Sequence, residues 1–271
     1  MKKLFLLFAA ALLAATCPAG GGAQFKIGGK KIDAGKLLNA GKDVAKAVTL
    51  NDEEIARLSR EAVEWMDANN PVAADSTTYG ARLKRLTEGI TDADGLPLNF
   101  KVYLVTDVNA FACGDGSIRV FAALMDLMDD DELMAIIGHE IGHVVHADTK
   151  HAMKNAYLAS AARNAAGAAE GSALARLSES QLGKVVAAFI DAQFSQKQEY
   201  EADEHGFEFC VKHGFDPYGM TNSLNKLVEL SKGAKASTVQ KMFSSHPDSE
   251  KRAARMKEKA DAYMAAQRQN R

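Results

Sequence analysis

The stretch Ala135-Ile136-Ile137-Gly138-His139-Glu140-Ile141-Gly142-His143-Val144-Val145 places two histidines and a glutamate inside an apolar run. Its apolar residues recur as they do on a buried helix. Four residues advance an α-helix by about 400°, so His139 and His143 project side by side, about 40° apart. Glu140 is turned by about 100° from His139. The H-E-x-x-H spacing therefore predicts that both imidazoles bind one zinc ion and that Glu140 lies beside it as a general base.

A chance match is the alternative interpretation of this motif. Two histidines on an ordinary helix can be solvated or hydrogen-bonded without any metal. The apolar neighbours of His139 and His143 argue against this alternative, because a buried histidine pair beside a carboxylate needs partners that offset its desolvation. A metal ion is such a partner.

A third ligand must come from elsewhere, because a catalytic zinc takes three protein ligands and leaves the fourth position to water. The best source is the segment Gln198-Glu199-Tyr200-Glu201-Ala202-Asp203. Glu199 and Asp203 are four residues apart and share one helix face, so one can bind zinc while the other accepts the free ring N–H of a zinc histidine. A solvated acidic face is the commoner fate of such a cluster. The upstream motif favours the ligand interpretation.

The N-terminus is typical of a signal peptide. Lys2 and Lys3 precede an uninterrupted apolar run over residues 4–15. About a dozen apolar residues are too few to span a bilayer, which needs roughly 20. No later stretch approaches 18 consecutive apolar residues, so we expect no spanning helix in the mature protein.

Two kinds of processing are open for this segment. Small residues at Gly21 and Ala23 favour signal-peptidase cleavage before Gln24. Lipidation at Cys17 would instead associate the protein with the outer membrane, but the neighbours of Cys17 are atypical for it. We therefore expect a periplasmic or secreted protein, with lipoprotein anchoring the less favoured alternative.

Composition excludes one class of partner and allows one sizeable domain. Of 271 residues, 47% are hydrophobic and 25% charged, which are ordinary globular values. The formal net charge of −2 leaves no basic surplus to neutralise a phosphate backbone, so nucleic acid is not an expected partner.

Helices dominate the local patterns. Asn51 is a capping residue for a helix that reaches about Asn69, and residues 79–86 form a second helix. Residues 98–105 and 117–121 are rich in β-branched and aromatic side chains and are predicted to be neighbouring strands. From Asp130 onward the pattern is helical. We expect an α+β, predominantly helical fold of zincin type, with a small β-sheet beside the H-E-x-x-H helix.

Four pieces of sequence resemble the motifs of metallopeptidase family forty-eight, a gluzincin family. The two signature pieces are Gly138-His139-Glu140-Ile141-Gly142-His143 and Phe194-Ser195-Gln196-Lys197-Gln198-Glu199-Tyr200-Glu201-Ala202-Asp203. Asn109-Ala110-Phe111 before a glycine turn and Ser245-His246-Pro247 followed by Arg252 also agree. Within the family, the chain is most similar to the secreted quality-control proteases of the bacterial envelope.

The resemblance covers residues 51–259 and implies roles for individual residues. It makes Glu199 the third ligand of one zinc ion per chain and Asp203 the carboxylate behind a zinc histidine. His246 becomes a candidate oxyanion donor and Arg252 a candidate substrate anchor. Their alternative is structural, with His246-Pro247 opening the last helix and Arg252 solvated.

Two positions depart from the pattern of this family. Gln196 stands where many relatives have arginine, and Asp148 stands where a further histidine is frequent. We expect neither residue to contact the zinc ligands, so both departures bear on local packing or regulation more than on catalysis.

The expected domain order is a signal peptide (1–23), a linker or loosely packed segment (24–50), a zinc metallopeptidase domain (51–265) and a tail (266–271). The expected reaction is hydrolysis of internal peptide bonds in unfolded or misfolded envelope polypeptides, with Glu140 carrying the proton. An extended substrate would pair with the sheet edge around Asn109 and Phe111.

Two other functions compete with this one. A zinc-stabilised holdase would close all four metal positions with protein ligands. Hydrolysis of a non-peptide amide, for example in the cell wall, has no visible wall-binding segment to support it. Separately, Cys113 and Cys210 are predicted to form a disulfide in an oxidising compartment, with two separate buried thiols as the alternative.

Overall fold

The computed structural model describes residues 24–27, 30–33, 50–165, 179–233 and 236–269. Two units make up the chain: residues 1–49 with 158–176, and residues 50–157 with 177–271. The predicted signal peptide and the lipidation alternative at Cys17 lie outside the described residues. Every predicted site residue lies in the second unit.

In the first unit, β1 (Gln24–Ile27) pairs antiparallel with β2 (Lys30–Asp33). Phe25 lies opposite Ile32 in this register. The described residues of the segment 24–50 are thus extended, and the expectation of a tether or a loosely packed helix is wrong for them.

Helix α3 (Asp52–Asn69) opens the second unit and begins where the sequence predicts it. Asn51 accepts a hydrogen bond from the Glu54 amide, and the Glu54 carboxylate accepts one from the Asn51 amide. This capping box satisfies two amides that the helix leaves free. Helix α4 (Thr78–Leu86) begins one residue before the predicted start and is capped by Thr77.

A small hairpin and a three-stranded sheet follow. Strands β3 (Asp92–Ala93) and β4 (Leu96–Pro97) are joined by Asp94 and Gly95, both with positive φ. Strands β5 (Asn99–Tyr103), β6 (Ala110–Ala112) and β7 (Ser117–Phe121) form a sheet in the order β5-β7-β6. The predicted pairing of β5 with β7 is confirmed, and it is parallel. Strand β6 pairs antiparallel with β7 and forms an edge of this sheet.

The two faces of this sheet differ in chemistry. Val102, Ile118 and Val120 join apolar residues of the H-E-x-x-H helix in one buried cluster. On the other face, the buried Arg119 meets Asp67 of α3 through two hydrogen bonds of 2.9 and 3.0 Å. Lys101 and Tyr103 bind the same carboxylate. The sheet therefore lies between the H-E-x-x-H helix and α3.

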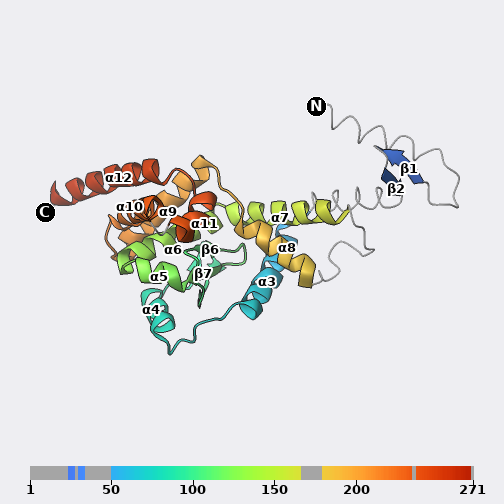
Figure 1. Cartoon of the computed structure of the whole chain (residues 1–271). Coiled ribbons are helices and arrows are strands. Elements are labelled where there is room, and N and C mark those ends of the chain that lie inside the picture. The colour runs from blue at the N-terminus through green and yellow to red at the C-terminus, as the bar shows by residue number, and fades with distance from the viewer. Residues whose placement is uncertain (1–23, 28–29, 34–49, 166–178, 234–235, 270–271) are drawn as a thin grey trace. The chain divides into compact units, whose positions relative to one another are not determined.

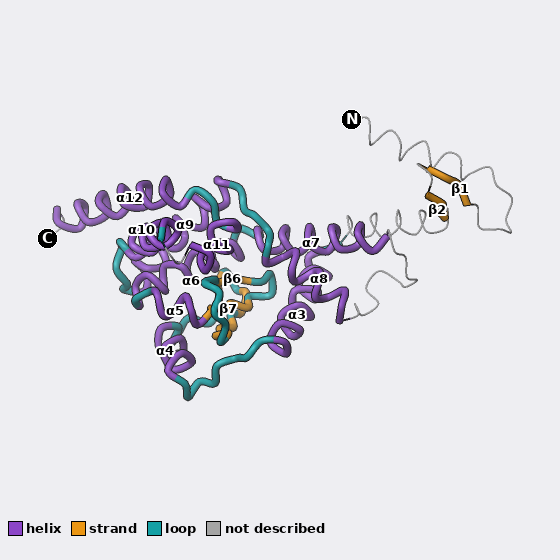
Figure 2. Tube along the Cα trace, in the orientation of Figure 1, coloured by secondary structure: helices purple, strands orange, loops and turns teal. Residues whose placement is uncertain are grey.

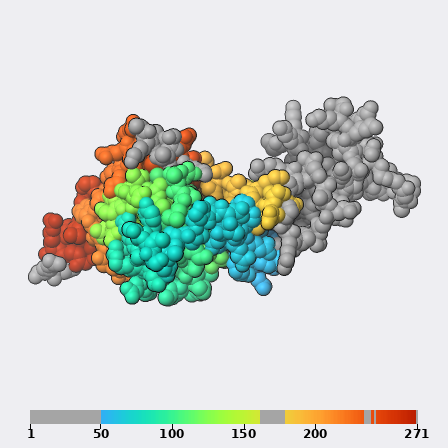
Figure 3. All heavy atoms as spheres, turned by 60° about the horizontal axis from the view of Figure 1, so that its bottom comes forward, coloured from blue at the N-terminus to red at the C-terminus, as the bar shows by residue number. Residues whose placement is uncertain are grey.

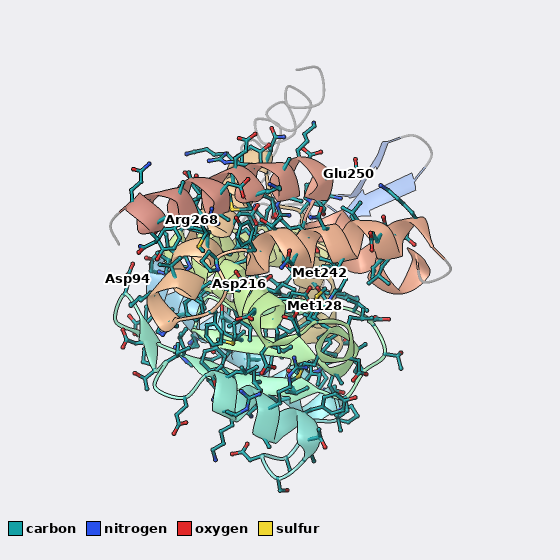
Figure 4. The ribbon with its side chains drawn as sticks, turned by 90° about the vertical axis from the view of Figure 1, so that its left-hand side faces the viewer. Asp94, Met128, Asp216, Met242, Glu250 and Arg268 are labelled. Atoms are coloured by element: carbon teal, nitrogen blue, oxygen red, sulfur yellow. The ribbon has the colours of Figure 1, made fainter. Side chains whose placement is uncertain are left out.

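Helices make up the rest of the described chain, as expected from Asp130 onward (Figures 1 and 2). They are α5 (Ala122–Leu127), α6 (Asp130–Val145), α7 (Asp148–Ala165), α8 (Glu179–Ile190), α9 (Gln196–His213), α10 (Gly219–Lys232), α11 (Ala236–Ser245) and α12 (Ser249–Gln269). Helix α12 packs on α10, and Figure 4 shows it running from Glu250 to Arg268. The α+β, mainly helical fold is confirmed.

Helix α8 packs against α3, and its yellow atoms adjoin the blue atoms of α3 in Figure 3. Gly183 allows this contact, because a Cβ there would lie 3.2 Å from the Trp65 ring. Among the helices of the described ranges, none is long and apolar enough to cross a bilayer.

The predicted disulfide is wrong: both cysteines in the described part of the chain are free, buried thiols. Cys210 packs with Ala135, Phe207 and Met220 in a second apolar cluster. Cys113 instead closes the turn after β6, where its amide donates to the Ser117 carbonyl.

Candidate metal centre

The approach of α9 to α6 depends on small residues at the helix crossing. A Cβ on Gly142 would lie 2.9 Å from the His205 Cβ and 3.0 Å from the Ala202 Cα. A Cβ on Gly206 would lie 2.9 Å from the Ala135 carbonyl oxygen. With only hydrogens at these points, the two backbones come close enough for short carboxylate side chains of α9 to reach the histidines of α6.

The structure brings His139, His143 and Glu199 together, as predicted. The Nε2 atoms of the two histidines lie 3.1 Å apart. Glu199 Oε1 is 3.5 Å from His143 Nε2, and Oε2 is 3.6 Å from His139 Nε2. All three side chains are buried, Glu199 completely. Ligand atoms held about 2.0–2.2 Å from a tetrahedral zinc lie roughly 3.3–3.6 Å from each other, so these spacings fit one ion.

His246 joins the same cluster. It directly follows α11, and its Nδ1 lies 3.0 Å from Glu199 Oε1 and 3.3 Å from His139 Nε2. Potential ligand atoms of His139, His143, Glu199 and His246 all lie within 4.8 Å of one another. The cluster therefore offers four side chains to a metal ion.

The donor chemistry fits a divalent cation. Three imidazole nitrogens converge at 3.1 and 3.3 Å, and protons shared among them cannot satisfy every lone pair. Within the described residues, the buried Glu140 Oε1 has no hydrogen-bond partner. Imidazole nitrogens with a carboxylate oxygen are ligands that suit zinc.

Asp203 lies behind His139, as predicted. Its Oδ1 is 2.9 Å from His139 Nδ1, which leaves Nε2 to face the cluster. Arg252 binds Asp203 through Nε and Nη2 at 2.7 and 2.6 Å and contacts Glu199 Oε2 through Nη1 at 2.5 Å. Because Arg252 is only 2% exposed, the solvated alternative for it is wrong.

Asp148 contacts a predicted ligand, contrary to expectation. Its Oδ2 lies 2.9 Å from His143 Nδ1. The expectation assumed that a residue beyond the end of the H-E-x-x-H helix would point away, but α7 begins at Asp148 and turns it back. Gln196 donates to Asp248 at 2.8 Å, so it ties the start of α9 to the segment between α11 and α12.

Electrostatics in the cluster follow from these contacts. Burial opposes protonation of His143, but its hydrogen bonds with Asp148 and Glu199 raise its pKa to about 9. Burial lowers the pKa of His139 in spite of Asp203. Burial would raise the pKa of Glu199, yet the neighbouring histidines, His246 foremost, hold it well below its usual range. Glu199 is therefore a carboxylate at any physiological pH.

The predicted substrate residues lie at the sheet edge. Asn109 directly precedes β6 and is 3% exposed, and among described residues its Oδ1 has no hydrogen-bond partner. The ring of Phe111 packs against Phe121 and Phe189, with centroids 6.0 and 6.3 Å away. Beside His139 and His246 there is also a cavity of about 20 Å³, room for one water molecule.

Sequence reasoning missed Phe194, which stacks on His143. The ring centroids are 4.0 Å apart and the planes differ by 17°. The Phe194 amide also donates to the Ser245 carbonyl, next to His246. Its place beside the helix-capping Ser195, at the start of the helix that carries Glu199, was the available signal.

Two buried histidines one helical turn apart, a remote glutamate and an adjacent unpartnered carboxylate define a metallopeptidase. Residues 79–260 match peptidase family M48, and the chain belongs to this family. The resemblance seen in the motifs is thereby confirmed.

Several relatives are metalloproteases by name. The chain is 37% identical to metalloprotease LoiP of Escherichia coli (strain K12) over 236 residues, 87% of this chain and 92% of that protein. It is 37% identical to metalloprotease YcaL of the same organism over 229 residues, 84% and 88% of the two chains. Similarity to the beta-barrel assembly-enhancing protease of Yersinia pestis is 30% over 212 residues, 72% of this chain and 41% of that one.

Proposed function

We propose that this metallopeptidase is a zinc-dependent endopeptidase that hydrolyses internal peptide bonds of unfolded or misfolded polypeptides in the bacterial envelope. The convergence of His139, His143 and Glu199 beside an unpartnered Glu140 carboxylate supports it most directly. The signal-peptide pattern of residues 1–23 supports the envelope as its location.

In this proposal His139, His143 and Glu199 hold the zinc ion. Zinc, when bound, supplies a Lewis acid that polarises the scissile carbonyl and lowers the pKa of water. Glu140 accepts the proton of the attacking water and delivers it to the leaving amine. Its Oε1 has no competing hydrogen bond among the described residues, so it is available for that proton.

His246 and Arg252 have different surroundings, which suggest different roles. His246 Nε2 lies 3.7 Å from Glu140 Oε1, so a proton on this nitrogen is close to where an oxyanion forms. We assign His246 as the oxyanion donor. The guanidinium of Arg252 is occupied by Asp203 and Glu199, which favours positioning of these two carboxylates over the expected anchoring of substrate.

Strand β6 is the element we assign to substrate binding. It is an edge strand, and an extended peptide can add to such an edge through backbone hydrogen bonds. The free Oδ1 of Asn109 is an acceptor for a substrate N–H, while Phe111 anchors the strand through its aromatic contacts. Backbone pairing reads little sequence and requires an extended chain, which suits unfolded substrates.

The holdase alternative gains one observation: with His246, the cluster holds four side chains that can ligate a metal. A closed site of four protein ligands is typical of structural zinc. The two functions make opposite predictions for the fate of a bound client.

The test uses one polypeptide in two states, a disulfide-stabilised globular protein offered either native or reduced and alkylated. We expect the zinc-loaded protein to cut the unfolded form at internal bonds, identified by mass spectrometry of the new termini, and to spare the native form. Glu140→Gln is the matched control and should bind without cutting. Client binding without cleavage by the intact, zinc-loaded protein would establish the holdase instead.

A further inference from the structure

Asp148 lies where the chain leaves the H-E-x-x-H helix. Ala147, between α6 and α7, has a φ of 61°, a left-handed conformation that turns the backbone sharply. The turn brings Asp148, the first residue of α7, back against α6. Its side chain is 6% exposed, and its Oδ2 lies 2.9 Å from His143 Nδ1.

The second oxygen of this carboxylate is held from another helix. Gln198 Nε2 donates to Asp148 Oδ1 at 2.5 Å. The same amide accepts through Oε1 from the amide and the hydroxyl of Ser195, at 2.9 and 2.8 Å. These partners fix the amide orientation, because a carboxylate accepts only from nitrogen and a backbone N–H donates only to oxygen. Both oxygens of Asp148 are therefore fixed.

We infer that Asp148 is a positioning residue for the second metal-binding histidine and that Gln198 holds it in place. A hydrogen bond from Nδ1–H to Asp148 leaves Nε2 of His143 without a proton, facing His139 Nε2 at 3.1 Å. Phe194 stacks on the imidazole and blocks its rotation. His143 thus has its tautomer set by Asp148 and its ring plane set by Phe194.

This arrangement links two ligands that are far apart in sequence. Gln198 directly precedes Glu199, so the first turn of α9 both delivers the remote ligand and orients His143 through Asp148. With Asp203 behind His139, each histidine of the motif has its own carboxylate partner. The inference rests on the proposed zinc function, but it concerns binding of the metal and needs no turnover.

The test measures zinc affinity by competition with a fluorescent chelator, together with the visible absorption spectrum of the cobalt-substituted protein. All variants are made in the Glu140→Gln background, so that failure of the proposed hydrolysis leaves the result unaffected. We expect Asp148→Ala to weaken zinc binding about 10- to 100-fold and to change the cobalt spectrum. Asp148→Asn, which can still accept from Nδ1–H, should recover part of the affinity, and Gln198→Ala should lose less than Asp148→Ala.

Glu201→Gln is the matched control. Glu201 lies on the same helix but pairs at 3.4 Å with the exposed Lys197, so this variant should bind zinc as the parent does. Circular dichroism of the metal-free proteins establishes folding, and if Asp148→Ala does not fold, Asp148→Asn and Gln198→Ala decide. Zinc affinity within twofold of the parent, with an unchanged cobalt spectrum, in the folded variants would overturn the inference. An equal loss in Glu201→Gln would overturn it too.

Discussion

Arg252 and Asp203 form a bidentate pair, with Nε 2.7 Å from Oδ2 and Nη2 2.6 Å from Oδ1, and neither side chain is more than 2% exposed. The pair joins α12 to α9 directly behind His139. Its burial explains why Arg252 is better suited to hold carboxylates in place than to meet a substrate.

Replacing Arg252 therefore tests its role. Arg252→Ala leaves Asp203 and Glu199 without their shared cation, and removal of one member of a buried pair costs about 3–5 kcal/mol. Urea unfolding of the metal-free protein should show this loss, and zinc affinity should fall with it. Arg252→Lys should restore only part, because lysine cannot bind bidentately. A raised KM with unchanged stability and zinc affinity would instead support a substrate anchor.

The crossing of α6 and α9 gives a second prediction. Gly142→Ala normally adds helix propensity, but here the new Cβ meets the His205 Cβ at 2.9 Å. Overpacking typically costs about 1–3 kcal/mol and should force the helices apart. We expect a lower melting temperature and weaker zinc binding. Gly233→Ala is the control, since its nearest neighbours lie 3.9 Å away. Equal behaviour of the two variants would argue against the close-approach account.

The ion cluster between α3 and the sheet predicts a pH dependence of stability. Burial opposes ionisation of Asp67, but hydrogen bonds from Arg119, Lys101 and Tyr103 outweigh it and lower the pKa of Asp67 from 3.8 to about 2. A depressed pKa stabilises the folded state above the unfolded-state value, and this stabilisation disappears as pH falls through the folded-state value. The Asp67 contribution is therefore complete above about pH 4 and is lost towards pH 2.

Asp67→Asn provides the comparison. Between pH 5 and pH 2, the free energy of unfolding of the metal-free parent should fall by about 2 kcal/mol more than that of Asp67→Asn. Urea titrations at several pH values give this difference. Parallel pH profiles for the two proteins would show that Asp67 is not the titrating group.

The free cysteines give a chemical prediction. Burial raises the pKa of both Cys113 and Cys210, the latter to about 12, so their thiols should be unreactive in the native protein. Protein beginning at Gln24 should titrate two thiols with Ellman's reagent after denaturation and almost none before it. Denatured protein without free thiols would restore the disulfide hypothesis.

Much of the local structure could be read from short-range patterns. The cap at Asn51, the helix that bears His139 and His143, and the pairing partners 99–103 and 117–121 all follow from capping and periodicity. Strand β6 could not, because three residues are too few to show alternation. Its existence depends on pairing with β7, which is a tertiary contact.

The limits at the site have the same origin. His139 and His143 are set by spacing along one helix, whereas Asp148 reaches His143 only because Ala147 adopts positive φ. Phe194 reaches the same imidazole from a different helix start. The disulfide failed for a related reason: sharing a helix stripe with Glu199 did not bring Cys210 to Cys113. Contacts between elements require their relative placement, which periodicity does not encode.

The central claim is that Glu140 carries the proton while His139, His143 and Glu199 hold the zinc. Zinc content and hydrolysis of an unfolded protein substrate, measured together on Glu140→Gln, test it most directly. We expect about one zinc per chain with at least a 100-fold loss of activity, since the ligands remain while the proton acceptor is gone. Activity of zinc-loaded Glu140→Gln within a few-fold of the parent would contradict the assignment.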